Sequence, residues 1–338
     1  MRKRYIYFSV LLFSIFCLTL TDSLADRILS RSVVVMDAST GKILYAKNPH
    51  LKRLPASTTK LMTSIIAIEN ASPSERVTIS RHASHVSPRK AGFREGDQVT
   101  VKQLLYAALL DSANDAAVAL SEGIAGSETN FVSLMNAKAQ SIGAENTRFI
   151  NSNGLPGGGQ YTTAHDLAKI MGYALGHQTL KKIIGTRETD ITTEEGNSIS
   201  LTNTNKLLWN DEDMIGGKTG YTRRAMHCFV CAAERENRTL IVAVLGSPSR
   251  NSLWRESETL INKGFDLLEN NREPVIYNTA AASDLYGSGK GKTKVSAKTR
   301  LKSRTLARKK SKTYVKRKYN RGKDLITARI YSLRSGLT

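Results

Sequence analysis

The chain has 338 residues, of which 40% are apolar, and this is enough to form a buried core in one large or two ordinary domains. Its net charge of +21 would suit a nucleic-acid-binding protein if the charge were spread over the fold. However, eighteen of the fifty Lys and Arg residues lie between Lys290 and Thr338, against a single acid, Asp324. The basic charge therefore belongs to a tail, and the body of the chain is nearly neutral.

The first 25 residues have the pattern of a secretory signal peptide. Basic residues at 2–4 precede an apolar run from Tyr5 to Leu20, and small residues at 23 and 25 favour cleavage before Asp26. The apolar run is short for a transmembrane span, although an uncleaved anchor would use the same residues. We therefore expect an exported protein, in the periplasm or on the outer face of the cytoplasmic membrane. Export in turn argues against a nucleic acid as a partner.

The body opens with two β-rich runs and a helix. Ser32 to Asp37 and Lys42 to Lys47 flank a turn sequence, which predicts a β-hairpin. After Pro55, apolar residues follow at helical spacing, namely Leu61, Met62, Ile65, Ile66 and Ile68. We therefore expect Ser57 to lie at the N-terminus of a helix.

Helical patterns dominate the middle of the chain. One runs from Val101 to Glu122 with an interruption, and a second runs from Phe131 to Ile142. A third, capped by Thr162 or Thr163, runs toward His177. Together they predict a helical region between the hairpin and the C-terminal half of the body.

Strand-like patterns return after Gly185. They include a run that begins at Lys218 and the runs Met226 to Ala233 and Arg238 to Gly246, and an amphipathic helix follows from Ser252 to Glu269. Strands at both ends of the body thus flank a helical middle. We expect an α+β fold in which helices pack on an antiparallel sheet.

After the signal peptide we expect a folded body over 26–270, a disordered basic linker or tail over 271–323, and a short amphipathic helix over 324–338. The linker has too few apolar residues to bury a core. The last segment carries an apolar stripe at helical spacing, made of Ile326, Ile330, Leu333 and Leu337. Three interpretations of this tail stay open: it contacts an anionic membrane surface, it contacts an envelope polymer, or it is a flexible basic tail without a binding role.

Three short motifs follow one another in the body: Ser-Thr-Thr-Lys at 57–60, Ser-Ala-Asn at 112–114 and Lys-Thr-Gly at 218–220. Positions i and i+3 of a helix share a face, so Ser57 and Lys60 should project together. A serine hydroxyl is a poor nucleophile until a base removes its proton, and a desolvated lysine near other cations can act as that base. The backbone N–H of Ser57, at the helix start, can donate to a developing oxyanion.

The second motif can supply a proton relay and a substrate contact. Ser112 can pass a proton to the leaving amine, and Asn114 can hold the substrate amide. Each pattern also occurs by chance, since Ser-Pro-Arg-Lys at 87–90 and Ser-Arg-Asn at 249–251 repeat the first two. The copy at 87–90 has no helical apolar run behind it. It is the ordered set of three motifs in fitting contexts that favours serine acyl transfer without histidine.

The third motif can bind the end of an extended peptide. Lys218 and Thr219 offer a positive charge and a hydroxyl to a carboxylate, on a strand whose edge pairs with the peptide. Gly220 lets the ligand approach the backbone. The N–H of Tyr221 is then the second oxyanion donor.

The cysteines and histidines of the body do not predict a metal site. Cys228 and Cys231 are three positions apart on an expected strand, so their side chains point to opposite faces and are interpreted as buried structural thiols. No second Cys or His pair accompanies them, and the histidine spacing fits no metal motif. We expect neither a metal nor another cofactor.

From about Ile28 to Glu269 the chain resembles the D-alanyl-D-alanine carboxypeptidases, the low-molecular-mass penicillin-binding proteins of serine peptidase family S11. The matching stretches lie at 55–63, 109–116, 149–155 and 217–222. The resemblance implies the penicillin-binding protein/β-lactamase-like transpeptidase fold, with an antiparallel sheet packed against a helical subdomain. It also implies removal of the terminal D-alanine from peptidoglycan pentapeptides and covalent binding of β-lactams. Many members carry a β-rich domain after the catalytic one, whereas the sequence after Asn270 is too short and too polar for it.

Carried over to this chain, the resemblance implies that Ser57 is the nucleophile and Lys60 its base. It assigns the second and third elements to Ser112, Asn114, Lys218, Thr219 and Gly220. An arginine on a neighbouring segment often helps to bind the substrate carboxylate in such enzymes. Arg250 is the candidate here, with a solvated loop charge as the alternative.

Other readings of the same motifs remain open. A serine β-lactamase shares all three, but class A enzymes use a loop Glu for deacylation, and the corresponding loop from Ile150 to Tyr161 has no Asp or Glu. A DD-endopeptidase would use the same residues on cross-linked peptides. A non-catalytic wall-binding or β-lactam-sensing protein is the alternative outside enzymes, and the intact pair of Ser57 and Lys60 argues against it.

Overall fold

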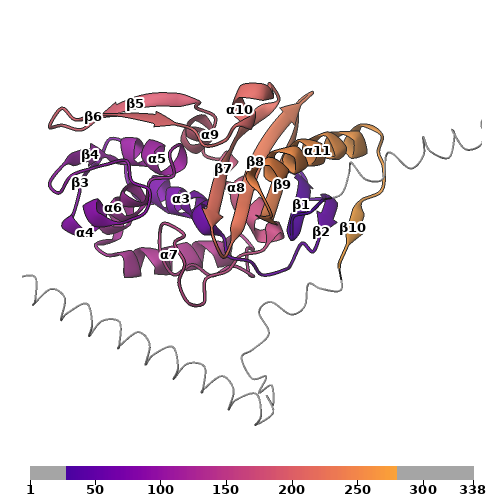
Figure 1. Ribbon diagram of the computed structural model, residues 1–338, viewed down its shortest axis with the longest axis horizontal. Helices are drawn as coiled ribbons and strands as arrows, with labels where there is room; N and C mark the ends of the chain where they lie inside the picture. Colours follow the sequence, from indigo (N-terminus) through magenta and orange to yellow (C-terminus); the bar gives the residue numbers. More distant parts are fainter. Residues whose placement is uncertain (1–27, 280–338) are drawn as a thin grey trace, which may run out of the picture. The chain divides into compact units, whose positions relative to one another are not determined.

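A computed structural model describes residues 28–279 of the chain (Figure 1). The expected signal peptide, the terminal amphipathic helix and most of the basic linker lie outside these residues. Among the helices that the structure describes, none has the length and apolar character needed to cross a membrane.

A six-stranded sheet with the order β10-β2-β1-β9-β8-β7 forms the centre of this part of the chain (Figure 1). Neighbouring strands are antiparallel except β10, which runs parallel to β2. The predicted antiparallel sheet is thus confirmed with one parallel edge strand added. The strands are β1 Ser32–Asp37, β2 Ile43–Lys47, β7 Met214–Thr222, β8 Met226–Arg235, β9 Arg238–Ser247 and β10 Val275–Tyr277.

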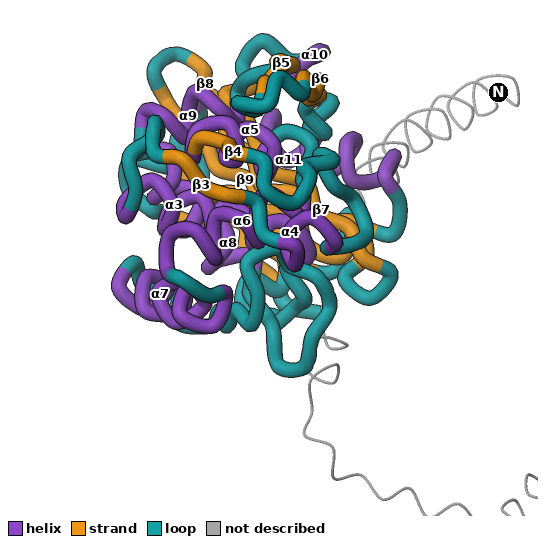
Figure 2. Tube along the Cα trace, turned by 90° about the vertical axis from the view of Figure 1, so that its left-hand side faces the viewer, coloured by secondary structure: helices purple, strands orange, loops and turns teal. Residues whose placement is uncertain are grey.

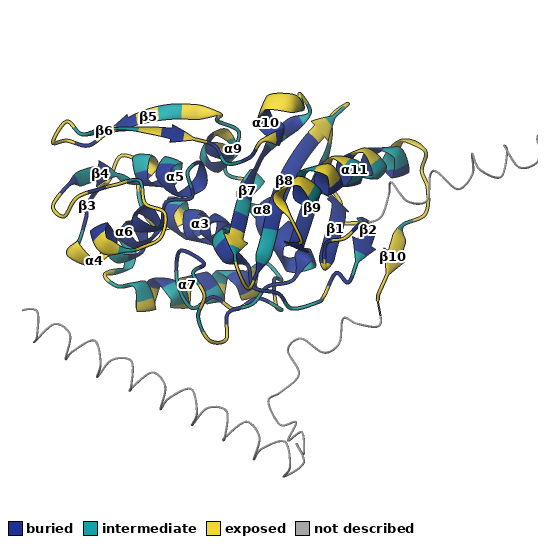
Figure 3. Cartoon of the chain, viewed as in Figure 1, coloured by how far each residue is buried: buried dark blue, intermediate teal, exposed yellow. Residues whose placement is uncertain are grey.

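Helices cover both faces of the sheet, and the alternation of strand side chains separates two cores. Helix α11, Arg250–Glu269, packs on one face with Val33 and Val35, and its outer side is exposed (Figure 3). Val34 and Met36 point to the opposite face, where α8, Ala164–Leu175, lies against β1 and β9. This period of two is what a sheet buried on both faces requires.

The helical middle of the chain forms a subdomain beside β7, and Figure 2 shows its helices toward the viewer. The predicted helices are confirmed, with the interruption between α5 and α6 and with Thr163 as the cap of α8. Its helices are η1 Ala56–Thr59, α3 Lys60–Asn70, α4 Arg81–His85, α5 Val101–Leu109, α6 Asn114–Ala125, α7 Glu128–Ser141 and α9 Gln178–Ile184, whereas the short α10, Leu207–Asn210, packs into the core on the α11 face of the sheet. Two strand pairs complete the subdomain, β3 Arg76–Thr78 with β4 Gln98–Thr100, and β5 Glu188–Thr192 with β6 Ser198–Thr202.

The boundary expected at residue 270 needs a correction, because the chain stays ordered beyond it. Strand β10 pairs with β2, and the Tyr277 hydroxyl lies 2.8 Å from that of Tyr45. Asn48 bonds both the backbone nitrogen and the hydroxyl of Thr279. A three-residue strand at a sheet edge needs only backbone pairing, so its polar sequence context concealed it.

Candidate active site

Ser57 lies in a tight turn that leads into α3. Ala56, just before it, has the left-handed φ of 49°. Such a conformation in a residue with a Cβ costs of order 1 kcal/mol and persists only where its surroundings hold it. The 3₁₀ turn of η1 then continues into α3, whose first residue is Lys60. Lys60 Nζ lies 3.2 Å from Ser57 Oγ, so the predicted shared face of the two side chains is confirmed.

Lys60 is fully buried, and three acceptors surround its amine. Besides Ser57 Oγ, the amine donates to Asn114 Oδ1 at 2.6 Å and to the carbonyl of Asn153 at 2.7 Å. Burial holds the pKa of Lys60 well below its usual range. The charges of Lys218 and Arg89 lower this pKa further, while Asp115 opposes them. A lysine in this environment can be neutral at moderate pH and can take a proton from Ser57.

The second motif connects α5 to α6, and its backbone is tightly held. Ser112 has a φ of 64°, and the neighbouring Ala113 donates to the carbonyl of Ala107 at 3.0 Å. Asn114 uses both ends of its side-chain amide inside the protein, with Oδ1 on Lys60 and Nδ2 on the carbonyl of Pro88. The structure therefore gives Asn114 an orienting contact to Lys60 in addition to the predicted contact with substrate.

The third motif lies within β7, which is an edge strand. Its free edge supports the expectation that an extended peptide pairs with it. Lys218 is fully buried, and its Nζ donates to the carbonyl of Thr219 at 3.0 Å. Burial, and then the charge of Arg89, lower the pKa of Lys218 to about 7, while Asp111 acts in the opposite direction. The hydroxyl of Thr219 lies 2.7 Å from that of Thr204.

Gly220 packs against the turn that carries Ser57. A Cβ at this position would lie 2.9 Å from Ser57 N and 3.1 Å from Ala56 Cβ. The fold itself therefore requires a glycine here, because β7 must approach η1 closely. This requirement adds to the expected role of Gly220 in admitting a ligand. Tyr221 follows it with 60% of its surface exposed, and its ring lies 4.5 Å from that of His227.

Arg250 begins α11 and is exposed. Its charge lowers the pKa of His227, after the larger effect of burial. His227 in turn pairs with Tyr221 across β7 and β8, one residue beyond the third motif. Arg250 makes no direct contact with Lys218 or Thr219 among the interactions of the described residues, and its predicted substrate contact stays a prediction.

The structure also brings to the site two groups that the motifs did not indicate. Asn153 reaches Lys60 through its backbone carbonyl, which carries no residue-specific signal. The neighbouring Gly154 has a φ of 83°, and a Cβ there would lie 1.9 Å from the carbonyl oxygen of Ala56. The glycine-rich sequence of this loop was the available signal. The second group is Arg89, which lies in the repeat of the first motif at 87–90 and whose charge acts on Lys60 and Lys218.

The two cysteines of the described residues offer no reactive thiol to this site, and one described cavity lies away from it. Cys228 and Cys231 are free, fully buried and in separate cores, as predicted. Within residues 28–279 no three His, Cys, Asp or Glu side chains come together in a way that could hold a metal ion.

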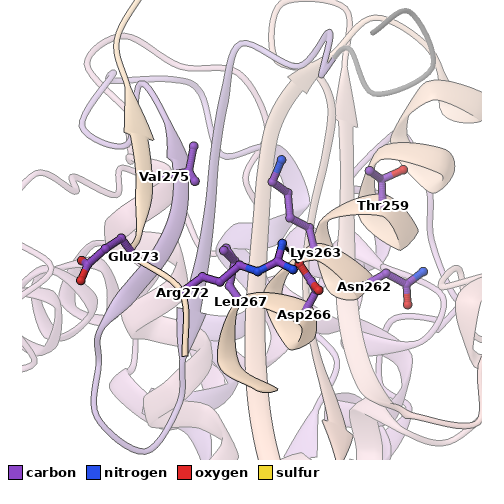
Figure 4. Close-up of a pocket in the computed structure, with 8 residues that line it drawn as sticks. All are labelled: Thr259, Asn262, Lys263, Asp266, Leu267, Arg272, Glu273 and Val275. Atoms are coloured by element: carbon purple, nitrogen blue, oxygen red, sulfur yellow. Dashed lines mark hydrogen bonds and ion pairs between the residues drawn. The ribbon is translucent and has the colours of Figure 1, made fainter. Parts of the chain in front are cut away.

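A cavity of about 680 Å³ lies between α11 and β10, where Arg272 pairs with Asp266 at 3.1 Å (Figure 4). It contains none of the predicted site residues, since β10 forms the opposite edge of the sheet from β7.

Comparison with known proteins gives consistent results. The family model described as D-alanyl-D-alanine carboxypeptidase matches residues 20–249. The carboxypeptidase DacF of Bacillus subtilis is 34% identical over 251 residues, which cover 73% of this chain and 63% of that protein. The D-alanyl-D-alanine carboxypeptidase of Streptomyces sp. K15 is 35% identical, covering 69% of this chain and 86% of that one. The crystal structure of the Streptomyces K15 DD-transpeptidase matches with a TM-score of 0.68 and 32% identity, over 71% of this chain and 98% of that one. The expected fold is confirmed, although this chain spans less than two thirds of relatives such as DacF.

Proposed function

The chain belongs to the D-alanyl-D-alanine carboxypeptidase family, and on this premise we propose that it removes the terminal D-alanine of peptidoglycan pentapeptides through an acyl-enzyme on Ser57. The observation that carries the proposal is the buried amine of Lys60, 3.2 Å from the Ser57 hydroxyl. The same chemistry accounts for covalent binding of β-lactams, whose strained amide takes the place of the peptide bond.

Acylation begins when Ser57 Oγ attacks the carbonyl between the two D-alanines, while Lys60 Nζ accepts the hydroxyl proton. The contacts from Asn114 and Asn153 hold the amine in place for this transfer. The backbone N–H groups of Ser57 and Tyr221 donate to the oxyanion. Lys60 then returns this proton through the Ser112 hydroxyl to the departing D-alanine nitrogen.

The terminal part of the substrate lies along the free edge of β7. Lys218 and Thr219 bind its carboxylate, and Arg250 contributes a further positive charge at the rim. Because the pKa of Lys218 is lowered to about 7, a bound carboxylate beside it would stabilise its charged form. Substrate binding and the protonation of Lys218 are therefore linked.

Water completes the reaction by hydrolysing the acyl-enzyme. The loop from Ile150 to Tyr161 contains no carboxylate, and the nearby Glu128 is occupied, because its Oε1 accepts from the Ser152 N–H at 2.9 Å and from the Ser152 hydroxyl at 2.6 Å. This supports slow hydrolysis of a penicilloyl adduct and a carboxypeptidase in preference to a β-lactamase.

The activity requires export, and the segments at the chain ends fit this location. The N-terminal sequence would direct the protein to the periplasm or the outer face of the cytoplasmic membrane. The basic tail would then hold the catalytic body at an anionic membrane surface. Cell fractionation of the full chain and of a chain truncated after Thr279 tests both parts. Recovery of both forms in the cytoplasm would contradict export, and equal membrane binding of the two would contradict the role of the tail.

Release of D-alanine from an acyl-D-Ala-D-Ala pentapeptide analogue tests the proposed reaction. Wild type should release it, and Ser57→Ala should not, while Ser133→Ala, on an exposed position of α7, should match wild type. Cleavage of cross-linked muropeptides alone would assign an endopeptidase. Labelling by penicillin without release of D-alanine would assign a sensor, and rapid turnover of nitrocefin would assign a β-lactamase.

A further inference from the structure

The loop that contains Arg89 makes hydrogen bonds to the second motif on both sides of Ser112. Arg89 directs its Nε to the carbonyl of Asp111 and its Nη2 to Asp111 Oδ1, at 2.6 Å. The carbonyl of Arg89 accepts from Asn114 N at 3.0 Å, and the carbonyl of Pro88 accepts from Asn114 Nδ2. One short loop thus bonds the residue before Ser112 and the second residue after it.

These hydrogen bonds hold backbone that lies in an unfavourable conformation. Ser112 and Arg89 have φ values of 64° and 59°, and such left-handed conformations are held by their surroundings. The fully buried Asp115 extends the contact, since its two carboxylate oxygens accept from the backbone nitrogens of Ala91 and Gly92, each at 3.0 Å. The loop and the second motif therefore form one hydrogen-bonded unit.

We propose that Arg89 is a positioning residue of the acyl-transfer site, which fixes Ser112 and Asn114 beside Lys60. The inference rests on the proposed function, because it concerns the groups that serve Ser57. Two hydrogen-bonded steps connect this loop to the base. The carbonyls of Arg89 and Pro88 hold Asn114, and Asn114 Oδ1 accepts from Lys60 Nζ at 2.6 Å.

The charge of Arg89 acts on the same lysines. It lowers the pKa of Lys60 after the larger effects of burial and of Lys218, while Asp115 raises it. It also lowers the pKa of Lys218 after burial, while Asp111 raises it. Removal of the arginine charge should raise the pKa of Lys60, so a higher pH would be needed to obtain its neutral form.

The pair of Arg89 and Asp111 lends itself to mutation, because the Arg89 side chain is 48% exposed. An ion pair with that exposure contributes little to stability, so Arg89→Gln should stay folded. Arg89→Lys keeps the charge but loses the two-pronged contact with Asp111. Arg94→Gln removes the same charge from an exposed arginine of the following turn and is the matched control.

The experiment measures the rate of acylation by a labelled penicillin between pH 5 and 9 on the full chain. Arg89→Gln should be slowed about tenfold or more, with the acid limb of its profile moved to higher pH. Acylation of Arg89→Lys should also be slowed, but the acid limb of its pH profile should stay near the wild-type position. Arg94→Gln should match wild type in both rate and pH profile.

Wild-type rate and pH profile in Arg89→Gln would overturn the inference, and so would a slowing explained by an equal loss of folded protein in the circular dichroism spectrum. Labelling of wild type in the same assay keeps the two proposals separate. If wild type is not labelled, the proposed function fails. If wild type and Arg89→Gln are labelled alike, only the role of Arg89 fails.

Discussion

Gly220 lies so close to Ser57 that a Cβ added at position 220 would be 2.9 Å from the Ser57 backbone nitrogen. This close approach brings the edge strand of the sheet to the turn that presents the nucleophile, and it leaves no room for a side chain. The same strand therefore supplies the ligand-binding edge and one wall of the Ser57 turn.

Replacement of Gly220 by alanine should displace this turn. We expect Gly220→Ala to lower the rate of acylation by labelled penicillin about tenfold or more, because sub-ångström shifts in a reacting group are costly. Gly158→Ala is the matched control, since a Cβ at Gly158 meets nothing within 4 Å. Equal acylation rates in the two variants would show that the contact with Ser57 is unimportant.

Replacement of Lys60 by arginine should abolish the base without removing its positive charge. A guanidinium does not lose its proton at accessible pH, so Lys60→Arg should lower acylation about a thousandfold. Lys42→Arg, on the exposed turn after β1, should be unaffected. In wild type, acylation should continue below the pH range of an ordinary lysine, because burial lowers the pKa of Lys60. An acid limb near pH 10 would contradict that assignment.

Lys218 should lower the stability of the fold, because its charged amine is buried, although it binds the substrate carboxylate. The unfolded chain binds a proton at this lysine up to about pH 10.5, whereas the folded chain releases it near pH 7. The unfolded state therefore holds more protons between these values, and the stability contributed by this group rises with pH across that window. At pH 6 and below, Lys218→Met should melt several degrees higher than wild type, since about 1 kcal/mol corresponds to ~2–4 °C in a domain of this size.

Melting temperatures of both proteins from pH 6 to pH 10 test this linkage. The advantage of Lys218→Met should shrink as the pH rises, while its acylation by penicillin stays low at every pH. A constant difference in melting temperature would mean that Lys218 keeps its ordinary pKa when folded.

Cys228 and Cys231 should stay reduced and unreactive in the folded protein. Burial raises the pKa of the Cys228 thiol to about 11 and that of Cys231 further still, so neither forms a thiolate at neutral pH. They also lie in separate cores. In a chain that starts at Asp26, a thiol reagent such as DTNB should therefore react with Cys228 and Cys231 only after unfolding. Rapid reaction under native conditions would contradict the predicted burial.

Local patterns account for most of what could be predicted. Ser57 and Lys60 are related by helix geometry alone, and the elements that carry Ser112 and Lys218 were visible in apolar periodicity. The sequence order of the motifs then indicated one site, although no periodicity shows that three segments meet in space.

The rest depended on contacts between distant segments. Asn153 acts through its backbone carbonyl, and Arg89 acts through a loop that folds onto Asp111, 22 positions away. Neither contact has a spacing that a single sequence reveals. Strand β10 was missed for a related reason, because its pairing with β2 joins residues more than two hundred positions apart.

The most direct test of the account is intact-protein mass spectrometry after brief exposure to benzylpenicillin, followed by mapping of the modified peptide. Wild type should gain the mass of one penicillin molecule on the peptide that contains Ser57, and Ser57→Ala should gain none. An adduct on another residue, or an equal adduct in Ser57→Ala, would contradict the assignment of Ser57 as the nucleophile.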